Sequence, residues 1–346
     1  MHIQNAWYVA AMSSEVTDKP LGRTICNHNL VMYRGKDDAI ACIEDFCPHR
    51  GAAMSLGYVE EGELICGYHG LRMGPDGQTI SMPKQRTDRF PCTRSFPVME
   101  KYGFVWVWPG DKALADESKL PKFHWAENEG WAYGGGLFHI KCDYRLMIDN
   151  LMDLTHETYV HSTSIGQKEI DEAPVKTRME GDQVITERFM PEVKAPPFWQ
   201  MAMEFQGLDP NAIVDRWQIC RFNAPSHIMI DVGVALAGNG GIDAPLEKRA
   251  SSVVVDFITP ETDSTMHYFW GMARNFQPED TALTDKIREG QGGIFTEDLE
   301  VLEAQQKNLD RYPDRDLLKL DIDAGGVQAR RMIERAIKLE QEAGNA

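Results

Sequence analysis

Two short motifs of cysteine and histidine, close together in the first 70 residues, restrict the fold more than any other feature. Cys47-x-His49 is followed, after sixteen intervening residues, by Cys66-x-x-His69. A glycine follows each motif within two residues, and glycine permits the tight turns that a ligand-binding loop needs. This part of the chain is therefore expected to fold as two loops around a metal centre.

The distribution of the four ligand types separates two kinds of metal centre. A structural zinc site usually pairs cysteine with cysteine and histidine with histidine, whereas each loop here offers one of each. The pattern suits a Rieske [2Fe–2S] cluster, in which Cys47 and Cys66 bind one iron and His49 and His69 bind the other. Structural zinc and a set of unrelated core side chains are the alternatives. The remaining cysteines are scattered, which predicts small buried side chains at Cys26, Cys42, Cys92, Cys142 and Cys220.

The composition excludes some classes of function. With 36 Lys and Arg against 53 Asp and Glu, the formal charge is −17, which argues against binding to nucleic acid or to an anionic membrane. No run approaches the roughly 20 apolar residues of a membrane helix. The N-terminus lacks the basic and apolar segments of a signal peptide, so a cytoplasmic protein is expected.

The order of β-type runs, turn signals and helical patterns along the chain predicts two domains of an α+β protein. Residues 1–115 carry short β-type runs (30–33, 39–43, 63–66 and 104–108) between turn signals, which predicts an all-β domain that holds the cluster. Residues 116–346 are expected to form the catalytic domain. A helix is expected over 145–161, followed by strands at 183–189, 214–222, 227–236, 251–258 and 265–274. Two closing helices are expected at 278–312, interrupted at 290–293, and at 325–342, over a curved antiparallel sheet.

A second group of possible ligands lies on the helix predicted over 145–161. His156 and His161 are five residues apart, roughly 140° around an ideal helix, so the helix must bend, bulge or end for both to reach one metal. Two imidazoles and one carboxylate form the facial triad of non-haem Fe(II) oxygenases. Spacing alone leaves four carboxylates open as the third ligand: Asp149, Asp153, Glu297 and Asp298.

The two groups in this order resemble the oxygenase components of the Rieske non-haem iron oxygenases. Further stretches, 133–139, 142–161, 166–173, 195–199 and 270–276, are similar to members that demethylate methoxylated aromatic acids. The resemblance implies a helix-grip catalytic domain and a monooxygenase that converts vanillate to protocatechuate and formaldehyde with O2. The same chemistry on another methoxylated acid, such as veratrate, is the alternative. An NADH-dependent flavin/iron–sulfur reductase would supply the electrons, and a homotrimer is implied.

The resemblance also implies roles for individual residues. His156, His161 and Asp298 would bind the mononuclear iron, and Asn150 would lie close to it. Asp153 would link a cluster histidine of one subunit to an iron-bound histidine of the next.

Substrate contacts are expected from the predicted strands. His227 and Asp231 share one face of a strand by their period of two, and Asp256 lies on a neighbouring strand. Asp231 and Asp256 roughly match substrate-contacting positions of a related demethylase, although the residue types differ. An aspartate would suit a phenol hydroxyl, and Arg221 could pair with a substrate carboxylate.

Overall fold

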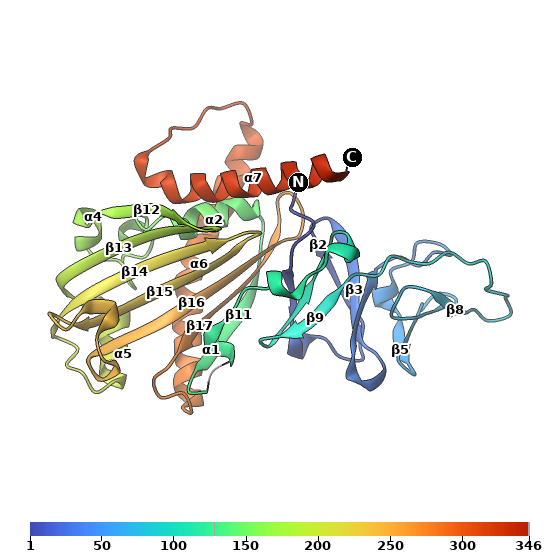
Figure 1. The fold of residues 1–346 in the computed structure, drawn as a ribbon, viewed down its shortest axis with the longest axis horizontal. Helices are drawn as coiled ribbons and strands as arrows, with labels where there is room; N and C mark the ends of the chain where they lie inside the picture. The colour runs from blue at the N-terminus through green and yellow to red at the C-terminus, as the bar shows by residue number, and fades with distance from the viewer. Residues whose placement is uncertain (128, 345–346) are drawn as a thin grey trace. The chain divides into compact units, whose positions relative to one another are not determined.

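The computed structural model describes residues 1–127 and 129–344, which fall into two compact units (Figure 1). The first unit comprises residues 1–122 and 259–263 with the C-terminal segment from residue 337. The second comprises residues 123–258 and 264–336. Each unit has its own sheets. The predicted domain boundary between residues 115 and 116 stays a prediction.

The first unit is all-β, as the sequence predicts. It contains three antiparallel sheets, in the strand orders β1-β10-β9, β2-β3-β4 and β5-β6-β7-β8. The strands are β1 (Tyr8–Met12), β2 (Leu21–Ile25), β3 (His28–Arg34), β4 (Ile40–Glu44), β5 (Tyr58–Glu60), β6 (Glu63–Ile65), β7 (Arg72–Met73), β8 (Thr79–Ser81), β9 (Val98–Lys101) and β10 (Phe104–Val107).

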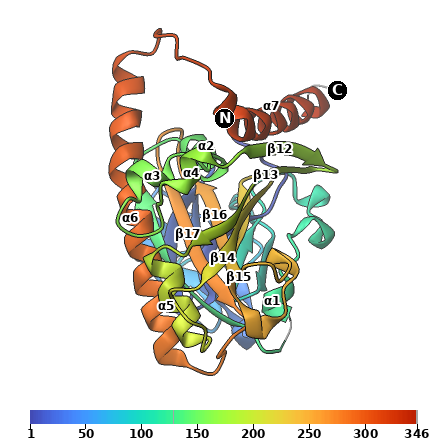
Figure 2. The ribbon, with the colours of Figure 1, turned by 90° about the vertical axis from the view of Figure 1, so that its left-hand side faces the viewer.

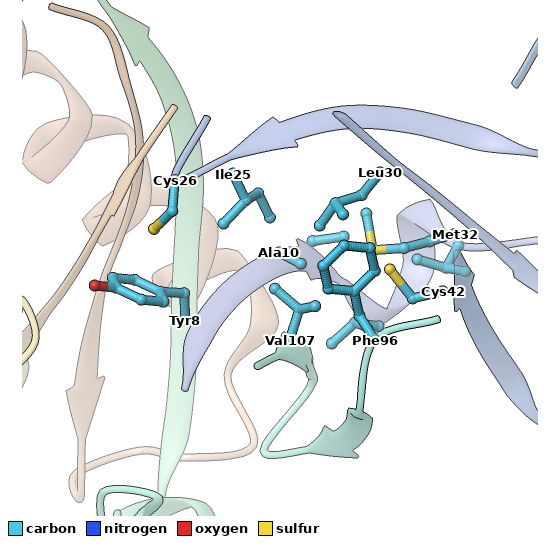
Figure 3. Packing of buried hydrophobic residues seen from close by; sticks show 12 residues of the cluster. Tyr8, Ala10, Ile25, Cys26, Leu30, Met32, Cys42, Phe96 and Val107 are labelled. Atoms are coloured by element: carbon cyan, nitrogen blue, oxygen red, sulfur yellow. The ribbon is translucent and has the colours of Figure 1, made fainter. Parts of the chain in front are cut away.

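Strand β3 separates two hydrophobic cores in this unit because its side chains alternate between the two faces. Leu30 and Met32 pack into the first core, which also contains Tyr8; Figure 3 shows part of it, with Phe96 and Val107 below Leu30 and Met32. On the opposite face of β3, Val31 and Tyr33 pack into a second core. That second core includes Cys47 and Cys66, so the cluster loops rest on a packed apolar base.

The second unit is a seven-stranded sheet with helices against it. The strand order is β11-β17-β16-β15-β14-β13-β12, and the long helix α6 packs against β11 and β17 (Figure 2). The strands are β11 (Ala132–Ile140), β12 (Val175–Glu180), β13 (Gln183–Lys194), β14 (Ile213–Asn223), β15 (His227–Leu236), β16 (Arg249–Pro260) and β17 (Met266–Arg274). The helices are α1 (His124–Glu127), α2 (Tyr144–Met152), α3 (Glu157–Val160), α4 (Glu169–Glu172), α5 (Pro197–Phe205), α6 (Thr281–Arg311) and α7 (Ala324–Gly344). The part of α7 from residue 337 belongs to the first unit. This arrangement is the predicted α+β class.

The structure corrects three details of the predicted elements. The helix expected over 145–161 is broken between α2 and α3, where Asp153 takes an extended conformation (φ −98°, ψ 119°). The interruption expected at 290–293 does not occur, and α6 runs through it. A Cβ on Gly292 would lie 2.9 Å from the Trp270 ring, so this glycine serves close packing of α6 on β17. Strand β11 was not predicted, because its run of three glycines has low β-propensity.

The cysteines outside the cluster motifs are mostly small core side chains, as expected. Cys26, Cys42, Cys142 and Cys220 are buried, whereas Cys92 is exposed because it lies in a loop before β9, so that expectation was wrong for Cys92. None of the helices within 1–127 and 129–344 combines the length and apolar character that crossing a membrane requires.

Candidate metal centres and substrate cavity

The two cluster motifs form loops with the same backbone hydrogen bonds. The Cys47 N–H donates to the Ala52 carbonyl (2.8 Å), and the Gly51 N–H donates back to the Cys47 carbonyl (2.8 Å). The second loop has the matching pair of bonds. The Cys66 N–H donates to the Leu71 carbonyl (2.9 Å), and the Gly70 N–H donates to the Cys66 carbonyl (3.0 Å). Both glycines have positive φ (70° and 72°), a conformation that glycine adopts without strain.

The loops bury the two thiols and expose the two imidazoles. Cys47 and Cys66 are both buried, and their thiols lie within hydrogen-bond range of each other. Burial raises the pKa of the Cys47 thiol. Backbone N–H groups of His49 and Arg50 donate to the Cys47 sulfur and oppose that rise. The rings of His49 and His69 are exposed, with centroids 4.6 Å apart. A buried thiol pair beside an exposed imidazole pair fits a cluster that binds one iron through sulfur and the other through nitrogen.

Three possible iron ligands converge in the second unit. His156 and His161 are the residues that immediately flank the short helix α3, and Asp298 is buried on α6. Helix α3 ends at Val160, and the backbone of His161 is no longer helical (φ −105°, ψ 32°), so the two imidazoles are not held at the angle of about 140° that a continuous helix would impose. Their ligand atoms lie within 4.8 Å of one another. The Asp298 carboxylate faces both rings, with Oδ1 3.6 Å from His156 Nε2 and Oδ2 3.3 Å from His161 Nε2.

The outer nitrogen of each imidazole has its own partner. His156 Nδ1 lies 2.9 Å from the Asp153 carbonyl oxygen, and His161 Nδ1 lies 2.6 Å from Glu297 Oε2. Partners of this kind fix the ring orientation and leave Nε2 as the metal-facing atom. Two imidazoles and one carboxylate in this arrangement are the donor set of a facial triad for iron.

The structure distinguishes the carboxylates that the sequence left open. Glu297 lies on the outer side of the His161 ring. Asp149 points away from the site and bonds the Arg330 guanidinium at 2.8 Å; burial raises its pKa, and Arg330 opposes the rise. Asp153 Oδ1 accepts bonds from the backbone and hydroxyl of Thr155, both at 2.7 Å. Only Asp298, among the four, belongs to the convergent group described here.

Asn150, on α2, holds the carboxylate of Asp298 in place. Its Nδ2 donates to Asp298 Oδ1 at 2.9 Å. Asn150 Oδ1 is buried and accepts no hydrogen bond from the residues that the structure describes. The side chain thus lies next to the three convergent ligands, as the resemblance implied.

A mostly apolar cavity adjoins these ligands. Its empty volume, with the open solvent at its mouth included, is about 650 Å³. The helical wall carries Asn150, Asp153, His156, His161, Phe295 and Asp298. The sheet wall carries Arg216, Gln218, Ile230, Val232, Val254 and Met272. An aromatic ring bound here would have apolar walls and a small number of polar groups to orient it.

The cavity lies on one face of the sheet, and most of the predicted substrate residues lie on the other. The even-numbered residues of β14 and β15 line the cavity, and the strand register keeps even residues opposite even residues. Arg221 and Asp231 are odd-numbered and form an ion pair with each other on the opposite face. His227 also lies on that face, with its ring 5.6 Å from Phe257. The structure therefore brings none of these three to the cavity.

Asp256 is the predicted substrate residue on the cavity side of the sheet. It shares this face with Val254 but is not part of the cavity lining. Asp256 is fully buried, and the Tyr268 hydroxyl donates to its Oδ1 at 2.6 Å. Burial raises the pKa of Asp256 to about 8, although the Tyr268 bond opposes the rise.

Two polar lining residues, Arg216 and Gln218, were not predicted from the sequence. Residues 214, 216, 218, 220 and 222 share one face of β14 by their period of two, but Trp217 and Ile219 on the opposite face are buried as well, so the pattern does not show which face adjoins the cavity. Arg221 was predicted to pair with a substrate carboxylate, but an odd separation of five residues places it and Arg216 on opposite faces of the strand.

Comparisons with known proteins agree with this geometry. A family model described as the Rieske [2Fe–2S] domain matches residues 6–99, and one described as the vanillate O-demethylase oxygenase C-terminal domain matches residues 140–339. The vanillate O-demethylase oxygenase subunit of Pseudomonas sp. (strain HR199 / DSM 7063) is 64% identical over 346 residues, which is 100% of this chain and 98% of that protein.

Solved structures show the same fold. Dicamba monooxygenase bound to 3,6-dichlorosalicylic acid has a TM-score of 0.89 and 34% identity, with 98% of both chains covered. Dicamba monooxygenase with non-heme iron and dicamba has a TM-score of 0.82 and 33% identity, with 99% of both chains covered. The predicted cofactors, a Rieske cluster and a mononuclear iron, are thereby confirmed at the level of the family. The chain belongs to the Rieske non-haem iron oxygenases, in the family of the vanillate O-demethylase oxygenase subunits.

Proposed function

We propose that this chain O-demethylates vanillate to protocatechuate and formaldehyde, using O2 and electrons from an NADH-dependent flavin/iron–sulfur reductase. The observation that carries the proposal is the 64% identity, over the whole chain, to a vanillate O-demethylase oxygenase subunit. The apolar cavity beside a two-histidine, one-carboxylate group supports it. Veratrate is the second candidate substrate.

The ligand assignment is part of this proposal. Cys47, Cys66, His49 and His69 would hold the cluster, and the burial of both thiols beside exposed imidazoles supports this. His156, His161 and Asp298 would hold the mononuclear iron, supported by their convergence within 4.8 Å. When bound, iron supplies the O2 chemistry by which one oxygen atom enters a methoxy C–H bond and the other leaves as water, with two electrons and two protons.

The residues around the cavity have the remaining tasks. The apolar side chains of Phe295, Ile230 and Val254 exclude water from the substrate ring and restrict its orientation. Asn150 fixes the orientation of the Asp298 carboxylate through the 2.9 Å bond. Glu297 accepts a hydrogen bond from the Nδ1–H of His161 and thereby keeps the Nε2 lone pair available. The hydroxylated methoxy group, a hemiacetal, then loses formaldehyde and leaves a phenol.

Asp153 is proposed as the link between a cluster histidine of one subunit and His156 of the next subunit in a homotrimer. Its Oδ2 lies 3.9 Å from His156 Nδ1, so the carboxylate is close to one of the two rings it would join. Exposed apolar side chains next to the cluster loops, including Leu56 (82% exposed) and Tyr68 (61%), support a protein interface there.

The cellular setting and the domain boundary also belong to the proposal. We place the protein in the cytoplasm, where thiols stay reduced, and the seven cysteines are free in the described residues. We keep the domain boundary at residues 115–116, between the all-β unit and the catalytic part of the chain.

A product assay tests the proposed function. The purified oxygenase is supplied with a reductase, NADH, O2 and vanillate, and formaldehyde and protocatechuate are measured together. Equal amounts of the two products are expected. NADH consumption without either product, repeated on a panel of methoxylated benzoates, would contradict the proposal. Higher turnover with veratrate than with vanillate would favour the alternative substrate.

A further inference from the structure

A buried group of charged residues forms part of the cavity wall and has more positive than negative charge. Arg188, on β13, and Arg216, on β14, are both buried, and both pair with the single carboxylate of Glu157, at 3.1 Å and 3.3 Å. Gln218 donates a further bond to Glu157, at 2.6 Å. Two guanidinium groups against one carboxylate leave one positive charge in a buried place, where an unpaired charge is costly.

Arg216 is the member of this group that faces the cavity. It is the sole Arg or Lys among the residues that line it, whereas Arg188 is not part of the lining. The next acidic residue whose charge acts on Arg216 is Glu169, which is solvent-exposed and therefore screened. Arg216 is thus the cationic group of a cavity wall that also carries the carboxylates of Asp153, Glu157 and Asp298.

Arg216 also retains donors for a ligand. One terminal nitrogen donates to Gln167 Oε1 at 2.6 Å, and the other donates to Glu157 Oε2 at 3.3 Å. A guanidinium has five N–H groups, so three are left, and Nε is buried without a hydrogen-bond partner in the described part of the chain. Burial lowers the pKa of Arg216 to about 10, which leaves the group protonated at neutral pH.

We propose that Arg216 binds the carboxylate of an aromatic acid in this cavity and so restricts the enzyme to anionic methoxylated benzoates over neutral methoxylated arenes. This inference rests on the proposed function and adds a specificity residue to it. A planar guanidinium matches a carboxylate in shape and charge. A substrate held at the β14 wall by its carboxylate would present its ring substituents to the α3 and α6 wall, where the proposed iron ligands lie.

The experiment compares vanillate with its neutral amide, vanillamide, because the two differ only in the anionic group. Binding to the anaerobic holoenzyme is measured by calorimetry, and formaldehyde release is measured in parallel. For Arg216→Met, the affinity for vanillate is expected to fall by about 10- to 100-fold, the effect of losing a charge-assisted hydrogen bond. The affinity for vanillamide should change by less than about threefold.

Arg221→Met is the matched control. It removes the same residue type from the same strand but on the opposite face of the sheet, where Arg221 pairs with Asp231. The control should bind vanillate as the wild type does. Iron content and thermal midpoint show whether each variant is folded and loaded. If Arg216→Met does not fold, Arg216→Lys carries the test, and vanillate affinity should still fall while vanillamide affinity stays.

The outcomes separate the inference from the proposed function. If a folded Arg216 variant loses equal affinity for vanillate and vanillamide, or loses affinity for neither, the inference is overturned. Failure of the wild type to bind vanillate more tightly than vanillamide would also overturn it. Selective binding of vanillate without formaldehyde release would support the carboxylate contact and contradict the proposed function.

Discussion

The two candidate metal sites of this protein are built in opposite ways. In the first unit, all four proposed cluster ligands come from two loops within residues 47–69, and each loop closes on its own backbone hydrogen bonds. In the second unit, two histidines beside α3 meet Asp298, which lies on α6, 137 residues after His161. The first site depends on local turns, whereas the second depends on how the short helix α3 and the long helix α6 meet on one face of a sheet.

This difference shows where each site is vulnerable. The cluster loops rest on an apolar core in which Cys47 and Cys66 are themselves packed, so ligand loss there should also weaken the core. The iron site lies among buried charges, including Asp298, Glu157 and Asp256, that depend on exact partners. Substitutions near it should change metal affinity, turnover or pH dependence without unfolding the first unit.

The largest expected effect concerns the link between the two sites. Asp153→Asn should abolish turnover coupled to product while both metal sites stay filled, because the proposed ligands are untouched and the carboxylate that would join two imidazoles is lost. Iron analysis, the cluster absorption spectrum and formaldehyde release measure this. Asp149→Asn is a suitable control, since Asp149 bonds Arg330 away from the iron group. Normal turnover in Asp153→Asn would refute the link.

A smaller effect is expected from the outer partner of His161. Glu297→Gln should weaken iron binding by about 10- to 100-fold, as is typical when the partner of a ligating histidine is replaced. Competition with a chelator, followed by iron analysis, measures the change. The cluster spectrum should not change, because Glu297 belongs to the second unit. Unchanged iron retention would mean that the 2.6 Å contact does not support the ligand.

The smallest effect concerns stability against pH. The pKa of Asp256 is raised to about 8, chiefly by burial, against an ordinary value of 3.8. The folded protein therefore binds a proton more tightly than the unfolded chain does, and stability falls as pH rises from about 4 to about 8. Asp256→Asn should remove this loss and be more stable than the wild type above neutral pH. The difference is at most several kcal/mol, because one pKa unit corresponds to about 1.36 kcal/mol.

Denaturant unfolding of the holoenzyme at pH 6 and pH 9 measures this difference. Asp231→Asn is the control, since Asp231 is half-exposed and pairs with Arg221 on the other face of the sheet. The wild type should lose more stability than Asp256→Asn between these two pH values. Equal losses would show that the buried carboxyl of Asp256 is not the cause of the pH dependence.

The sequence was informative wherever the structural cause is local. The Cys/His spacing predicted the cluster loops, and runs of β-type residues predicted most strands and the α+β class. The five-residue separation of His156 and His161 correctly required the helix to bend, bulge or end between them, and α3 ends at Val160. Spacing could not decide which carboxylate is near them, because α6 approaches only in the folded state. The cavity face of β14 could not be told from the sequence, because both faces of the strand contain buried residues, and the predicted Arg221 lies on the opposite face from Arg216.

The most direct test of this account is metal analysis of two variants, Asp298→Ala and Cys66→Ser. The wild type should contain about three iron atoms and about two acid-labile sulfides per chain, since a [2Fe–2S] centre carries two of each. Asp298→Ala should lose one iron, keep both sulfides and retain the cluster spectrum. Cys66→Ser should lose the sulfides and the spectrum. Full iron content in Asp298→Ala, or an intact cluster in Cys66→Ser, would contradict the assignment of two independent sites.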